Sequence, residues 1–149
     1  MSEDLALRRG DLAIGADGDL QLVRNTTKLT QDVLKVIHTP LGSNPFSPRI
    51  GSPLTAVNVG ELLDSNFAEQ RVETGVEQAI QLIRNIQQQQ EIQQEVTAAE
   101  KIRDILEIIA TRNELEPRQF DISISVQSDD LTSVTIPDFA FDTTIGSDQ

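Results

Sequence analysis

The side chains that could do chemistry in this chain offer little for nucleophilic catalysis. His38 is the only histidine and cysteine is absent, so no Ser-His or Cys-His system can be built around a second base. His38 sits beside an apolar helical stripe and just before Pro40, where a cation at a helix end is the commoner role. We expect it to cap a helix and to have no catalytic role.

Metal binding has no better support. The sequence has no pair of histidines and no calcium-loop spacing. Asp11, Asp17 and Asp19 are instead placed as turn residues of a predicted hairpin. We therefore expect no metal site, no cofactor and no catalytic residue of this kind.

Paired carboxylates are the remaining route to an enzyme, because glycoside hydrolysis needs only two. The chain has 24 acidic residues, so some pair will lie at a suitable distance. No acid is set in an apolar segment of the kind that would keep a general acid protonated. We expect a non-enzymatic protein and keep a peptidoglycan muramidase as the alternative.

Size and charge narrow the class further. The chain has 149 residues and a net charge of −12, and its densest basic cluster is Arg8-Arg9. Nucleic acid and anionic membrane are thus poor partners, since both are bound through basic patches. We expect one domain over residues 1–137 with an acidic tail over 138–149, made in cytoplasm, since neither a signal peptide nor a membrane span is recognisable.

The elements that would position any site begin with a hairpin and a helix. Residues 11–23 alternate apolar and polar around a Gly-Ala-Asp-Gly turn, which predicts a hairpin. Residues 29–37 carry a helical stripe, with Thr26 or Thr27 as the cap and an end by about Thr39. Residues 40–60 predict an ordered loop that buries Phe46, Ile50 and Leu54, followed by a helical turn over 60–64.

A long helix and a second hairpin complete the pattern. A helical stripe starts near Phe67 and runs into a glutamine-rich stretch, for which we favour a break near 92–97 over one continuous helix. Thr97-x-x-Glu100 is a capping-box pattern and predicts another helix through about Leu115. Residues 120–126 alternate as a strand, Asp129-Asp130 forms a turn, and a further strand follows, which Pro137 either ends or marks as an edge strand. The prediction is an α+β fold: one small antiparallel sheet from the N-terminal and C-terminal hairpins, packed against three to four helices.

One corner has a possible binding role. Pro117 forces Glu116 out of the helical region, and Arg118 is the last positive charge in the chain. A guanidinium on a rigid corner suits multidentate capture of carbonyl or carboxylate groups. A helix terminator beside an ordinary surface arginine explains the same residues, and physical chemistry alone favours that simpler interpretation.

With these features in place, the chain resembles the lysozyme-like baseplate wedge, or sheath-initiator, family of contractile phage tails, whose type VI secretion counterpart is TssE. The resemblance covers roughly residues 10–136 and is carried by the hairpin leading into the first helix, the proline-and-glycine loop after it, and Glu116-Pro117-Arg118 ahead of an alternating strand.

The resemblance implies a structural subunit of a virion tail baseplate that joins the wedge core to the first sheath ring. Sheath assembly would be templated by strand addition to the final hairpin, residues 119–136, with Asp121, Asp129 and Asp130 deterring unwanted pairing. The implied partners are wedge core proteins, the tail sheath protein and, as further candidates, tube or hub proteins; the isolated chain would be a monomer, present in multiple copies in the assembly. A TssE-like subunit of a secretion or injection machine is the alternative. The expected partner-binding residues are Glu116, Pro117, Arg118, Ile122, Ile124, Val134, Ile136, Phe139 and Phe141.

Overall fold

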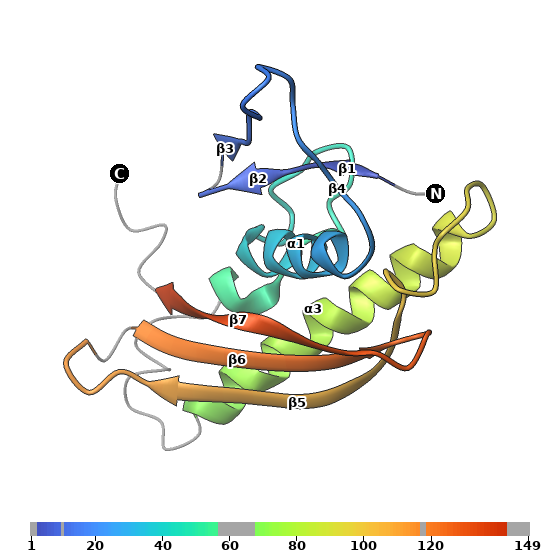
Figure 1. Cartoon of the computed structure of the whole chain (residues 1–149). Coiled ribbons are helices and arrows are strands. Elements are labelled where there is room, and N and C mark those ends of the chain that lie inside the picture. Colours follow the sequence, from blue (N-terminus) through green and yellow to red (C-terminus); the bar gives the residue numbers. More distant parts are fainter. Residues whose placement is uncertain (1–2, 10, 57–67, 117–118, 143–149) are drawn as a thin grey trace.

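The computed structural model describes residues 3–9, 11–56, 68–116 and 119–142. The fold is mixed α+β, as predicted, and is built in layers (Figure 1). A three-stranded sheet lies against two helices, and a small N-terminal hairpin lies on the far side of the first helix. The predicted helical turn at 60–64 falls outside the described residues.

Both α-helices of the described chain are predicted by their apolar stripes. Helix α1 spans Asn25–His38 and buries Leu29, Val33 and Ile37, and it ends before Thr39 as expected. Its N-cap is Arg24, with no side-chain hydrogen bond, so the prediction of a threonine cap was wrong. Helix α3 spans Ala68–Gln90 and buries the predicted face, namely Val72, Val76, Ala79, Ile80 and Ile83.

The loop between the helices is anchored at one of its three apolar residues. Leu54, in the short 3₁₀ helix η1 (Pro53–Ala56), is 3% exposed and packs in the core. Phe46 is 94% exposed, so its predicted burial was wrong, and Ile50 is half-buried. A parallel bridge between Pro40 and Ser52 joins the two ends of the loop. Leu54 can therefore reach the core although Phe46 stays exposed.

The C-terminal sheet has the order β5-β6-β7, with β5 at Ile102–Arg112, β6 at Gln119–Ser128 and β7 at Ser133–Asp142. In β6 the buried and less buried residues alternate as predicted, with Phe120, Ile122, Ile124 and Val126 in the core. The face toward the helices is therefore apolar, and the opposite face carries Asp121, Ser123, Ser125 and Gln127.

Strand β5 replaces the helix predicted after Thr97. The capping-box residues do meet, because the Thr97 N–H donates to Glu100 Oε1 at 3.2 Å, but they close a turn. The strand has two register irregularities, between Ile102 and Asp104 and between Ile105 and Glu107. Because each adds a residue, the side chains that face the core are three residues apart instead of two. Ile102, Ile105 and Ile108 follow at intervals of three, which imitates a helical stripe. The break near 92–97 was correct, since α3 ends at Gln90.

The N-terminal hairpin forms separate sheets, which corrects the prediction of a single sheet shared by both hairpins. Strands β1 (Asp4–Leu5) and β4 (Leu22–Val23) pair, as do β2 (Leu7–Arg8) and β3 (Asp11–Leu12). The predicted turn is present, with the Gly15 N–H donating to the Asp19 carbonyl at 2.8 Å. The hairpin is joined to α1 through Gln31, whose amide donates to the Leu5 carbonyl and accepts from the Leu7 N–H, each at 2.8 Å.

Candidate functional site: the edges of the C-terminal sheet

The C-terminal sheet has two edges, and they are the feature of this fold best suited to binding another protein chain. Strand β6 is paired on both sides, whereas β5 and β7 are each paired on one side only within the described chain. An unpaired strand presents a row of N–H and C=O groups to which a partner strand can add. Figure 1 shows the two edges on opposite sides of the sheet, with α1 near β7 and α3 crossing behind β5.

The β7 edge lies beside the N-terminal half of α1. A groove of about 360 Å³ separates them and is lined by hydroxyl-bearing and small residues: Thr26, Thr27, Thr30, Thr132, Ser133, Val134, Thr135 and Pro137. The Thr30 hydroxyl donates back to the Thr26 carbonyl at 2.9 Å, inside its own helix. The single hydrogen of this hydroxyl is therefore used within α1 and not on the β7 backbone.

Strand β7 is an edge strand that continues past Pro137 to Asp142, so the predicted edge position of Pro137 is confirmed and the alternative, a strand end there, is not. A register irregularity between Ile122 and Ile124 accommodates the proline. Phe139 belongs to this extension: it is half-buried, packs against the core, and its ring centroid lies 5.4 Å from that of His38. The His38 ring nitrogen Nδ1 lies 2.8 Å from the Leu34 carbonyl, which can only accept, so Nδ1 carries a proton and His38 satisfies a carbonyl of the last helical turn, as predicted.

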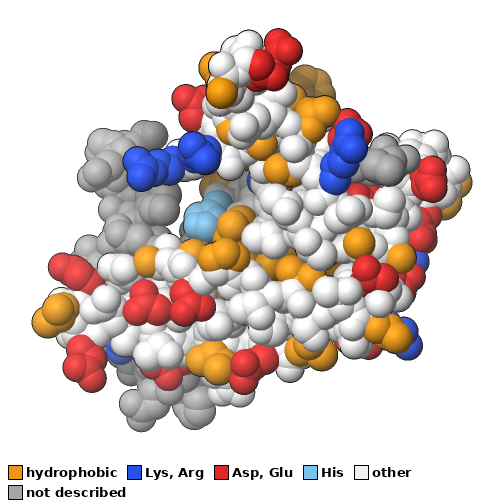
Figure 2. Space-filling model, in the orientation of Figure 1, with side chains coloured by type: hydrophobic (Ala, Val, Ile, Leu, Met, Phe, Trp, Pro, Cys, Tyr) orange, Lys and Arg blue, Asp and Glu red, His pale blue; other side chains and the backbone are white. Residues whose placement is uncertain are grey.

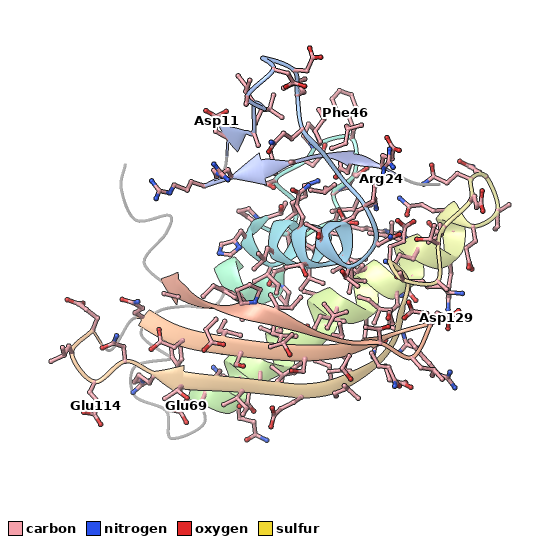
Figure 3. The ribbon with its side chains drawn as sticks, viewed as in Figure 1. Asp11, Arg24, Phe46, Glu69, Glu114 and Asp129 are labelled. Atoms are coloured by element: carbon pink, nitrogen blue, oxygen red, sulfur yellow. The ribbon has the colours of Figure 1, made fainter. Side chains whose placement is uncertain are left out.

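The β5 edge is contacted by side chains of α3. The Ala110 N–H donates to Glu73 Oε1 at 3.1 Å, and the Arg112 N–H donates to Glu69 Oε1 at 3.0 Å. Glu69 is labelled in Figure 3, at the end of α3 that underlies the end of β5. Two of the main-chain donors on this edge are thus already satisfied within the molecule.

Between these contacts and the start of β5 lies a groove of about 390 Å³. Its lining is Gln70, Glu73, Thr74 and Glu77 from α3, and Ile105, Leu106, Glu107 and Ile108 from β5. Leu106 is 50% exposed there, and Ile109 beside it is 44% exposed. This stretch of β5 is therefore open to solvent between the contacts at its two ends.

The corner that carries Glu116 is a loop between two strands, and not the end of a helix as predicted. The Asn113 side chain accepts hydrogen bonds from the N–H groups of Leu115 and Glu116, at 2.9 and 3.2 Å, and the Gln119 N–H donates to the Glu116 carbonyl. Glu114, labelled in Figure 3, projects from this loop away from the sheet. Glu116 is exposed, and Pro117 and Arg118 lie outside the described residues.

Four of the expected partner-binding residues have side chains in the core. Ile122, Ile124, Val134 and Ile136 are all at most 7% exposed on the face against the helices. Ile122 and Ile124 also lie on the central strand, so their backbone cannot receive a partner strand; Val134 and Ile136 can offer only backbone, on β7. Phe141 pairs with Phe120 in the ladder.

The acidic residues expected to guard the hairpin do not lie along an edge. Asp121 is on the central strand, and Asp129 and Asp130 lie in the turn after β6. Asp129 is labelled in Figure 3, and its Oδ2 lies 3.9 Å from Lys101 Nζ. Hydrogen bonds from the Ser128 hydroxyl and then from Thr132 hold the pKa of Asp130 below its usual value of 3.8, so this carboxylate stabilises the turn.

The described residues form no metal-binding cluster, and their buried glutamate lies outside the grooves beside the sheet edges. Within that part of the chain, no group of three or more His, Cys, Asp or Glu could hold a metal ion. Glu100 is 1% exposed, but it serves the turn before β5 and lines neither of the grooves beside the sheet edges. No helix among the described residues is long and apolar enough to cross a membrane.

A third hollow lies on the other side of α1, below the N-terminal hairpin. It encloses about 620 Å³ and is lined by Leu7, Arg9, Val23, Thr27, Thr30, Gln31, Leu34, Lys35 and His38. In Figure 2 the histidine and neighbouring basic side chains appear around a recess between the hairpin and the sheet. Lys35 is paired with Asp4. Burial acts to raise the pKa of Asp4, but the hydrogen bonds from Lys35 and the Leu5 N–H, with the nearby positive charges, together lower it below its usual value.

Comparison with known proteins supports the fold alone. No protein-family model matches the chain, and no curated protein sequence matches it. Among solved structures, the chain is similar to a Geobacter sulfurreducens protein named provisionally as a tail lysozyme, with a TM-score of 0.60 and 13% identity over 80% of this chain and 92% of that one. The chain therefore shares the fold of that protein over most of its length.

Proposed function

We propose that this protein is a non-enzymatic structural subunit of a contractile tail baseplate, which joins the wedge core to the first sheath ring. The observation that carries the proposal is the outer edge of β7, with which no other strand of the described residues pairs, in a fold similar to that of the protein provisionally named a tail lysozyme. A sheath strand would add to β7 through main-chain hydrogen bonds. Glu116, on the loop at the opposite end of the sheet from the β6–β7 turn, would contact the wedge core together with Pro117 and Arg118, which follow it in the sequence.

The experiment that tests this role compares purified tails from cells that carry wild-type protein or Arg118→Ala. We expect the variant to fold normally in isolation, because neighbouring Glu116 is exposed, and to leave tails without an ordered sheath. Glu114→Ala, at an exposed charged residue four positions earlier, is the matched control and should assemble normally. Normal sheathed tails from the Arg118 variant would remove the wedge-contact part of the proposal.

A muramidase is the second candidate, and one observation favours it. The groove beside β5 brings together the carboxylates of Glu73, Glu77 and Glu107, and the similar structure carries a lysozyme name. Against it, Glu73 is engaged with the Ala110 N–H, and its groove partners Glu77 and Glu107 are exposed to water, which does not favour a protonated general acid.

A turbidity assay on peptidoglycan separates the two candidates. We expect no clearing by the purified chain. Clearing that is lost in Glu77→Gln or Glu107→Gln, with the fold retained by circular dichroism, would establish the hydrolase and overturn the structural proposal.

A further inference from the structure

We infer that α3 closes the β5 edge against strand addition, so that β7 is the edge left for a partner strand. This inference rests on the proposed function for its partner, but its physical content concerns the isolated chain. It also gives a role to the glutamine-rich end of α3.

The closure is made at both ends of β5. At the C-terminal end, Glu73 and Glu69 accept the N–H groups of Ala110 and Arg112. At the N-terminal end, Gln87 accepts the Ile102 N–H at 2.9 Å and donates to the Glu100 carbonyl at 2.7 Å. A side-chain amide that pairs with two backbone groups of one segment reproduces what a neighbouring strand would supply.

The spacing of these three side chains explains how one helix reaches both ends of the edge. Glu69 and Glu73 are one turn apart, and Gln87 follows about four turns later on the same face. From Glu69 to Gln87 the helix rises about 27 Å, and β5 spans about 33 Å from Ile102 to Arg112. Figure 1 shows α3 crossing behind the sheet at an oblique angle, in the direction opposite to β5. The hydrogen bonds of Glu69 and Gln87 connect the two halves of the helix to the two ends of the strand.

A partner strand would gain little at such an edge. It would have to displace carboxylate acceptors, which make stronger hydrogen bonds to N–H groups than a carbonyl does. The open stretch at Leu106 is faced by Glu73 and Glu77, which lie in the path of an approaching backbone. At β7 the facing residues from α1 are threonines, and Thr30 turns its hydroxyl back into its own helix.

The test uses the double variant Glu69→Ala/Glu73→Ala and two controls. Glu69→Gln/Glu73→Gln keeps an oxygen acceptor at each site, and Glu77→Ala removes a carboxylate from the same groove that is not the acceptor of either N–H. We expect amide exchange at Ala110 and Arg112, followed by NMR, to be at least about tenfold faster in the alanine variant than in wild type or either control. Equal exchange in all four proteins would overturn the inference.

A second measurement tests whether two copies of the chain pair through β5 once its edge is no longer closed. The chain has no native cysteine, so Ile109→Cys on β5 and Thr135→Cys on β7 report contacts without interference. In the alanine background we expect concentration-dependent dimers that Ile109→Cys traps as disulfides, whereas the same cysteine in the wild-type background stays monomeric. Dimers trapped equally in both backgrounds would overturn the inference.

The proposed function and this inference fail separately. If no sheath strand adds to either edge of the sheet in assembled tails, the proposed function is lost, while the exchange and disulfide results on the isolated chain still stand. If sheath strands are found on β5 of the wild-type protein, the closure is refuted and the structural role survives.

Discussion

Gln87 offers the sharpest test of how the sheet is attached to the helices. Its side chain is 4% exposed and holds the Glu100 carbonyl and the Ile102 N–H at the start of β5. Gln87→Ala leaves both backbone groups buried without a partner, and each such group costs about 1–3 kcal/mol. Since alanine is the better helix former by a few tenths of a kcal/mol, we expect a net loss of about 3 kcal/mol in the free energy of unfolding.

The assay is urea denaturation followed by circular dichroism, because the chain has neither Trp nor Tyr for fluorescence. Gln88→Ala, one residue along on the exposed side of the same helix, is the matched control and should stay within about 0.5 kcal/mol of wild type. Stabilities of Gln87→Ala and Gln88→Ala that agree within about 0.5 kcal/mol would refute the reasoning.

A second substitution at the same site tests the direction of each hydrogen bond. Gln87→Glu keeps the acceptor for the Ile102 N–H but places an oxygen 2.7 Å from the Glu100 carbonyl, where a donor stood. At neutral pH we expect at least the loss seen in Gln87→Ala, because a buried charge is added to a missing bond. As the pH falls, protonation of the new carboxylate supplies a donor again, so the difference in the free energy of unfolding between variant and wild type should become smaller. A difference that does not change with pH would contradict the assigned amide orientation.

The remaining predictions concern the loops and turns. Gly51→Ala should destabilise the fold by roughly 1–3 kcal/mol in urea, because Gly51 has φ +138° and an added Cβ would lie 2.8 Å from Leu41 backbone atoms; an unchanged midpoint would contradict this. Phe46→Ser should leave stability within about 0.5 kcal/mol of wild type, since Phe46 is 94% exposed, and a larger loss would place the ring in the core. Asp130→Ala should cost stability at pH values above 3.8, where the carboxylate is charged in both folded and unfolded chains, and the difference should fade as the pH falls through the lowered pKa of the folded state; a difference independent of pH would argue against the charged turn.

Much of the fold follows from periodicity that the core enforces directly. The stripe of α1, the face of α3 and the alternation in β6 each place apolar residues at the spacing of a regular element, and each is buried as predicted. The first hairpin is predicted by its glycine-containing turn, which the structure confirms. These signals are local, so a single sequence is enough to read them.

Strand β5 could not be predicted in this way because its irregularities change the period. The inward residues Ile102, Ile105 and Ile108 carry the spacing of a helix, and Thr97 with Glu100 makes a genuine local hydrogen bond at the place where a helix would begin. The one signal available was composition: β5 has four isoleucines, and β-branched residues favour strands.

The candidate site depends on tertiary contacts that no local pattern encodes. Glu69 and Glu73 look like solvent-facing helix residues, and Gln87 looks like one member of a polar run. Only the position of α3 beside β5 turns them into edge partners. Likewise the core positions Ile122, Ile124, Val134 and Ile136 were expected to meet a partner because the strands were predicted without knowing which one is central.

The central claim is that this chain is a tail subunit that receives a sheath strand at β7. The most direct measurement is cross-linking of Thr135→Cys in purified tails, with Ile109→Cys as the matched position on β5. We predict a product that joins Thr135→Cys to the sheath subunit and no such product from Ile109→Cys. Absence of the chain from purified tails, or sheath cross-links from Ile109→Cys alone, would contradict the claim.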